Sequence, residues 1–208
     1  MWLVLYVAVC FISTGNNMDF FKYRNKIPPE KGRLLISEPF LPDPNFIRSV
    51  VLLCEHNSEG SFGFVLNRLA EVNASEILEE LSNFEHPVFI GGPVQQDTLH
   101  FIHRCADIEG GECITSGIYW GGSFEQVTFL ANTGQLRPEE IRFFLGYSGW
   151  GPGQLEEELE QDTWIVCDYV TEELLFNTGP DAMWRNALKN MGGKYSVFAN
   201  YPMDPSQN

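Results

Sequence analysis

The sequence predicts a single domain of the α+β class, built on a largely antiparallel or mixed sheet. Strand-like segments come first and helix-like segments are mixed in later, without the regular alternation that a parallel sheet requires. The chain has 208 residues, of which 44% are apolar, and no low-complexity linker or internal repeat divides it. Such a chain can bury one sizeable core, which excludes disordered, collagen-like and disulfide-dense classes.

The first half of the chain predicts three strands and one helix. Short β-branched or aromatic segments bounded by turn residues indicate strands at 33–37, 48–54 and 62–67. Asn73 followed by Glu76 is typical of a capping box, and apolar residues then recur at helical spacing. We therefore expect a helix over 74–83.

The second half predicts three more strands, then helices separated by one further strand. Strands are expected at 87–90, 98–103 and 113–119, between glycine-rich turns. Pro138 and the two acids after it suit a helix N-terminus, so we expect a helix running through Leu145 and ended by Gly146. A second, acidic helix is expected from Gln154, a buried strand at 164–170, and a last helix from Asp181 to the Gly192–Gly193 pair.

The charge balance excludes some partners. Thirteen Lys and Arg residues face 28 Asp and Glu residues, a formal net charge of -15. Nucleic acids are bound mainly by cations that displace counterions, so we expect neither direct nucleic-acid binding nor binding to an anionic membrane. The basic cluster at 22–33 is interpreted as a solvated arm. Eight acids between Glu156 and Glu173 indicate a solvated helix face, or else a docking surface for a basic protein partner.

The cysteines and the N-terminal segment bear on location. Five scattered cysteines without a C-x-x-C pair favour reduced thiols in the cytoplasm. The apolar run 2–12 is shorter than the roughly 20 residues of a membrane-spanning helix, and it lacks a preceding basic residue and a cleavage pattern. We expect the native chain to start at Met18 and residues 1–17 to come from a start codon assigned too early, with an export signal as the alternative.

Several short patterns could carry chemistry, and each also has a purely structural interpretation. Cys54 and His56 stand two apart in a strand, which suits a nucleophile–base pair, half a metal site, or simply a core thiol beside a turn. The Gly91–Gly92 turn lacks the Lys-Ser/Thr of a phosphate loop and favours a structural role. The glycine-rich segment 146–154 indicates an architectural corner or the rim of a ligand site.

Two functional hypotheses follow from these patterns. The first is a non-enzymatic regulatory or protein-interaction role, with any effect on transcription exerted through an unknown protein partner. The second is a small-molecule-binding protein or enzyme. Its site would lie near His56, Asn67, Gly91, Gly92, Trp150 and Gln154. No catalytic residue, metal site or cofactor is predicted.

A series of motifs also carries a family resemblance. In order, these are Gly32–Ser37, Asp43–Val51, His56–Arg68, Gly91–Val94, Gly146–Trp150, Gly153–Glu158 and a tryptophan-bearing helix ending at Gly192–Gly193. From Gly32 to Pro202 the chain resembles the YqgE/AlgH family of bacterial proteins. The segment 119–123 departs from the shorter form of proteobacterial members and indicates a variant branch.

The resemblance implies a bent sheet that forms a pseudo-barrel with flanking helices, in a cytosolic protein. It implies a domain over 32–204, a peripheral basic arm at 18–31 and a short tail at 205–208. One family member is linked to transcriptional regulation of exopolysaccharide production. The family has no established catalytic residues, so none is carried over to this chain.

Overall fold

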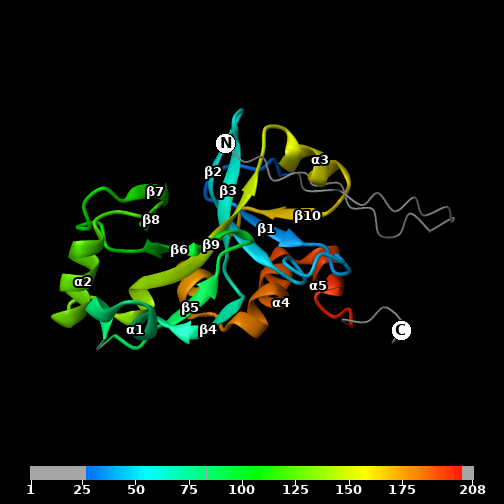
Figure 1. The fold of residues 1–208 in the computed structure, drawn as a ribbon. Coiled ribbons are helices and arrows are strands. Elements are labelled where there is room, and N and C mark those ends of the chain that lie inside the picture. Colours follow the sequence, from blue (N-terminus) through cyan, green and yellow to red (C-terminus); the bar gives the residue numbers. More distant parts are fainter. Residues whose placement is uncertain (1–26, 83, 203–208) are drawn as a thin grey trace, which may run out of the picture.

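The structure, a computed structural model, describes residues 27–82 and 84–202. Within these ranges ten strands form one bent sheet in the order β10-β1-β2-β3-β9-β6-β8-β7, and β4 and β5 join it beside β9 (Figure 1). The segment 1–17, most of the basic arm and the tail 205–208 lie outside the described residues. No described helix has the length and apolar character needed to cross a bilayer.

One half of the sheet is a fully antiparallel group buried on both faces. It consists of β1 (Leu34–Ser37), β2 (Val50–Asn57), β3 (Gly60–Val65) and β10 (Trp164–Cys167). Side chains alternate between the faces of a strand, so Leu34 and Ile36 enter one cluster and Leu35 enters the other.

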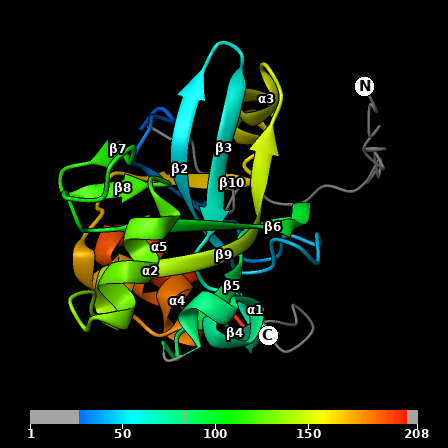
Figure 2. The same ribbon diagram turned by 60° about the vertical axis from the view of Figure 1, so that its left-hand side comes forward.

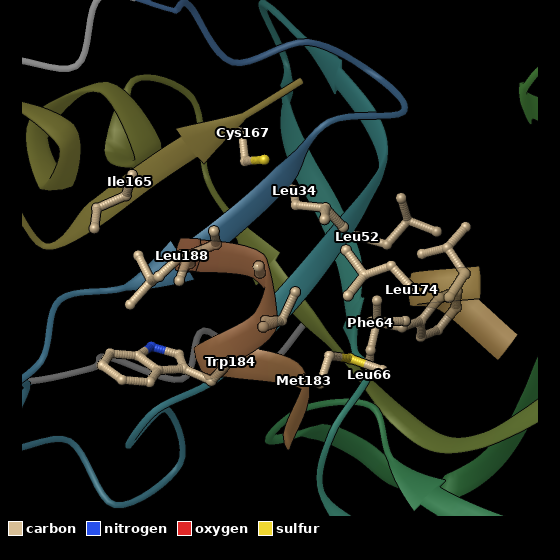
Figure 3. Close-up of a cluster of buried hydrophobic side chains, with 14 of the residues drawn as sticks. Leu34, Leu52, Phe64, Leu66, Ile165, Cys167, Leu174, Met183, Trp184 and Leu188 are labelled. Carbon is tan, nitrogen blue, oxygen red and sulfur yellow. The ribbon is translucent and has the colours of Figure 1, made fainter. Parts of the chain in front are cut away.

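Helices cover both faces of this half. On one face lie η4 (Glu173–Asn177), α4 (Pro180–Met191) and α5 (Gly193–Phe198). Figure 3 shows Met183, Trp184 and Leu188 of α4 packed against strand side chains such as Leu34. The buried indole of Trp184 donates to Ser37 O at 3.0 Å, which fixes α4 on β1. The opposite face is covered by α3 (Gln154–Glu160).

The other half is organised around β9 (Ile141–Trp150), which belongs to both halves of the sheet. β9 pairs with β3 and with β6 (Val94–His103), and it runs parallel to β5 (Pro87–Ile90). The hairpin of β7 (Glu112–Thr115) and β8 (Ile118–Trp120) continues from β6. A separate apolar cluster lies beneath β4 (Leu69–Asn73), α1 (Ala74–Ile77), η2 (Glu79–Leu81), α2 (Phe124–Asn132) and η3 (Pro138–Glu140).

The predicted single-domain α+β fold is confirmed, and the sheet is bent but not closed. β7 and β10 remain the two ends of the strand order. The bend nevertheless brings Ile114 and Ile118, from the β7–β8 hairpin, into the same buried cluster as Leu34 of β1. The pseudo-barrel is therefore held by packing across its opening.

The largest correction concerns residues 141–145, which form a strand where a helix was predicted. Only Pro138–Glu140 make a short helical turn, and β9 begins at Ile141. Ile141 and Phe143 face one core cluster and Phe144 faces the other. A continuous apolar run fits the spacing of a helix and of a strand equally well. Here the residues form a strand, because both faces of that strand are buried in the core.

Other boundaries also differ from the predictions. The helix expected over 74–83 ends at Ile77, because Leu78 is extended and a separate turn follows at Glu79–Leu81. The predicted strand 113–119 is a hairpin, β7 and β8. The strand β4 and the helices α2 and α5 were not predicted.

Candidate functional site

Three of the six predicted site residues lie in the region where the β2–β3 hairpin approaches α3. His56 lies near the end of β2, Trp150 ends β9 and Gln154 begins α3. Figure 2 shows this hairpin rising beside α3 and the end of β9. Asn67, Gly91 and Gly92 lie elsewhere in the sheet, so the six residues do not form one site.

His56 contacts a hydroxyl group and a carboxylate. It is the cross-strand partner of Ser61, and His56 Nδ1 is 2.7 Å from Ser61 Oγ. His56 Nε2 lies 3.7 Å from Glu156 Oε1 on α3. The turn that joins the two strands is closed locally by Asn57, whose Oδ1 accepts from Glu59 N at 2.8 Å.

This arrangement places a hydroxyl, an imidazole and a carboxylate in the order of an activated nucleophile, its base and an orienting acid. Ser61 borders a depression of about 260 Å³ whose other lining residues include the acids Glu55 and Glu59. The hydrogen bond between His56 and Ser61 is formed, whereas the distance from His56 to Glu156 exceeds that of a hydrogen bond. In the tautomer that carries its proton on Nε2, His56 accepts a hydrogen bond from Ser61 Oγ through Nδ1, and the carboxylate of Glu156 lies on the Nε2 side.

Trp150 and Gln154 belong to a structural clasp centred on Glu158. The indole N–H groups of Trp150 and Trp164 donate to Glu158 Oε2 at 2.9 and 2.7 Å. Gln154 Nε2 donates to Glu158 Oε1 at 2.9 Å, and its Oε1 accepts from Gly151 N at 3.1 Å. These contacts fix α3 against β9 and β10, and they occupy the polar groups of both predicted site residues.

The side-chain amide of Asn67 is hydrogen-bonded to the backbone that leads into β2. Its Oδ1 accepts from Val50 N and its Nδ2 donates to Arg48 O, both at 2.9 Å. Val50 and His56 stand six residues apart along β2, about 20 Å at the rise of an extended strand. Asn67 therefore lies far from the His56 cluster and joins two chain segments.

Gly91 and Gly92 mark a close approach of two backbones. A side chain on Gly91 would place its Cβ 2.3 Å from Gly146 O, and one on Gly92 would lie equally close to Tyr147. The N–H of Gly91 donates to Leu145 O at 2.8 Å, while its carbonyl accepts from Ser148 Oγ at 3.0 Å. The turn packs β5 against β9, and both polar groups of Gly91 are satisfied within the protein.

The thiol and metal interpretations of the Cys54–His56 pair find no support in the structure. Cys54 is fully buried in the core, where burial raises the pKa of the thiol and keeps it protonated. The described ranges contain no group of three or more His, Cys, Asp or Glu side chains placed to share a metal ion.

Two surface features were missed at the sequence level. One is an aromatic hollow of about 310 Å³ lined by Phe62, Phe64, His100, Trp120 and Tyr147. The other, which we call the α2 surface, is a depression of about 540 Å³ lined by Glu80, Phe124, Glu125, Thr128, Phe129, Asn132 and Thr133. Both join segments far apart in the chain, so only the pairing of the strands and the docking of α2 could reveal them.

Comparisons with known proteins identify the family. The model of the AlgH-like family (DUF179) matches residues 34–196. A UPF0301 protein of Cytophaga hutchinsonii is 49% identical over 86% of this chain and 98% of its own, and one of Chlorobium limicola is 46% identical over 85% and 95%.

Solved structures agree with this assignment. The solution structure of AlgH from Pseudomonas aeruginosa matches with a TM-score of 0.65 and 30% identity, over 83% of this chain and 94% of its own. A Corynebacterium diphtheriae crystal structure shares the fold, with a TM-score of 0.71 at 20% identity over 84% and 94%. The protein described here therefore belongs to the AlgH-like family.

Proposed function

We propose that this protein is a non-enzymatic regulatory protein of the cytoplasm that acts by binding a protein partner. The observation that carries the proposal is Phe129, which is 61% exposed on helix α2 beside an apolar depression. Large exposed apolar side chains that gather around a depression are typical of interaction surfaces. The α2 surface is thus the proposed docking site.

The lining residues of the α2 surface support a partner of matching chemistry. Phe124 and Phe129 supply aromatic area, while Glu80 and Glu125 supply the charge among its lining residues, which include no Lys or Arg. Asn132 Nδ2 donates to Glu80 O at 2.8 Å, which joins α2 to η2 across the surface. The matching partner segment carries an aromatic or aliphatic anchor flanked by Lys or Arg.

The acidic run 156–173 is a weaker candidate for the same role, because several of its carboxylates are already engaged. Glu158 accepts the two indole N–H groups, Glu172 pairs with Arg104, and Glu173 accepts from Asn177. The remaining acids of α3 form a solvated face.

Any effect on transcription is exerted through this partner. With a net charge of -15, the protein repels phosphate polyanions. We expect no sequence-selective DNA binding at physiological salt in a mobility-shift assay, and salt-sensitive, sequence-selective binding would contradict the proposal.

A photo-crosslinking residue at position 129 tests the docking site. It should capture one discrete partner, and the same residue at Val197, which is 55% exposed on α5, should not. Changing Glu80 and Glu125 to Gln should reduce capture at 129, because the charge complementarity is lost. Equal adducts at both positions, or capture insensitive to the Gln changes, would refute the assignment.

A second candidate function rests on the 2.7 Å contact between His56 and Ser61, with Glu156 beyond it. In that case the protein binds or hydrolyses a small ester or amide at the depression beside Ser61. A panel of activated esters tests it. Turnover abolished by both Ser61→Ala and His56→Gln would favour this function, and turnover that is absent or unchanged in the variants would exclude it.

A further inference from the structure

The aromatic hollow is formed by four strands that are adjacent only in the folded sheet. Phe62 and Phe64 lie on β3, Tyr147 on β9, His100 on β6 and Trp120 on β8. Its volume of about 310 Å³ lies at the lower end of the range of roughly 300–1,000 Å³ for small-molecule sites. The hollow is separate from the α2 surface, with which it shares no residue.

The orientation of the rings favours a rounded ligand group over a flat one. The plane of Phe62 stands at 82°, 75° and 83° to those of Phe64, Trp120 and Tyr147. His100 is tilted by 40° to Phe64 and by 84° to Tyr147. None of these measured pairs is parallel, and the ring of Phe62 packs edge to face against its three neighbours at centroid distances of 6.0, 5.0 and 6.2 Å. Ring faces turned in different directions around one hollow can together contact a rounded cationic group.

The electrostatics of the hollow favour a cation. Its lining contains no Lys, Arg, Asp or Glu, and the aromatic faces carry negative partial charge. Burial lowers the pKa of His100, so the imidazole is neutral at pH 7 and does not repel a cation. The overall charge of -15 adds a general attraction for positively charged solutes.

Trp120 carries an N–H group that lacks a hydrogen-bond acceptor in the part of the chain that the structure describes. Its indole Nε1 is buried and has no hydrogen-bond partner among the described residues. A buried donor without an acceptor is costly. Trp120 lines the hollow, and an oxygen atom on a ligand would satisfy this N–H group once the indole turns it toward the hollow.

We propose that the aromatic hollow binds the trimethylammonium group of a small solute that also carries a hydroxyl or carboxylate oxygen, the chemistry of choline. A peptide with a methylated lysine shares the ammonium group but needs a surface on which its backbone can lie. β6 pairs with β8 only at Ile102 and His103, so the part of β6 that carries His100 has a strand partner on one side, β9. The volume of about 310 Å³ suits a small solute, so the proposal commits to a free solute, and the methylated peptide is the competing occupant in the test.

Calorimetric titration of the full chain with choline chloride, at about 0.15 M salt to screen general attraction, tests this proposal. We expect one site, with binding at least tenfold weaker for 3,3-dimethylbutanol, which has the shape of choline but no charge. Trp120→Leu should weaken choline binding about tenfold, as expected for loss of a desolvated cation–π contact. Tyr147→Leu provides a second variant if the first fails to fold.

Matched controls make the result decisive. Phe129→Leu removes an aromatic ring from the α2 surface and should leave choline binding unchanged. Trp120→Phe keeps a ring but removes the N–H, so it should weaken choline more than tetramethylammonium. No choline binding up to about 10 mM, equal binding of dimethylbutanol, or binding of a trimethyllysine peptide alone would each overturn the proposal.

Discussion

Replacing Glu158 with Ala should destabilise the protein strongly, because this one carboxylate satisfies two tryptophans. Trp150 and Trp164 are only 6% and 1% exposed, so both indole N–H groups lose a charged acceptor in a largely buried position. A hydrogen bond to a charged acceptor contributes roughly 1.5–3 kcal/mol, and an unsatisfied buried donor costs about 1–3 kcal/mol. We expect Glu158→Ala to lower the free energy of unfolding by about 3–5 kcal/mol.

Urea denaturation followed by tryptophan fluorescence and far-UV circular dichroism measures this loss. Glu157→Ala is the matched control, because Glu157 is exposed on the same helix, and it should change stability by less than about 0.5 kcal/mol. Glu158→Gln keeps a neutral acceptor for the indoles and should cost about 1 kcal/mol. If Glu158→Ala were as stable as the Glu157 control, the clasp would not hold α3 in place.

Three other predictions concern the rest of the sheet and the response to pH. Gly92→Ala should cost about 3 kcal/mol of stability from backbone overlap, whereas Gly179→Ala, with open space around it, should have little effect in the same denaturation assay. Asn67→Ala should cost about 1–3 kcal/mol through its two backbone hydrogen bonds, and an unchanged urea midpoint would contradict that role. Burial lowers the pKa of His100 and His103 in the folded state, so the unfolded chain, with imidazole pKa values near 6.5, binds more protons below that pH. The free energy of unfolding should therefore fall as the pH drops from about 6.5 toward the folded pKa values, and stability that rises over this window would refute the reasoning.

The fold class could be predicted because short strands bounded by turn residues leave a strong local signal. β1, β5 and α3 lie where the sequence placed them, since turns or a helix start mark them clearly. β9 was mistaken for a helix because its apolar residues fit both periods, and only pairing with β3, β5 and β6 distinguishes the two. The break at Leu78 likewise depends on the tertiary position of the residue and not on helix propensity.

The candidate site was predictable only in part, for a related reason. Residue type flagged His56, Trp150 and Gln154 as chemically unusual, and the fold does bring them together. Residue type could not reveal that the side chains of Trp150 and Gln154 are both hydrogen-bonded to Glu158, since these contacts depend on the docking of α3. Phe129 was missed because helix α2, on which it is exposed, was not predicted.

Hydrogen–deuterium exchange of the protein, alone and in complex with the partner captured at position 129, tests the proposed docking role most directly. The account predicts added protection of backbone amides in Glu79–Leu81 and Phe124–Asn132, with no change in Gln154–Glu160. Protection confined to Gln154–Glu160, with α2 unchanged, would show that the partner binds the acidic helix and would contradict the assignment of the α2 surface.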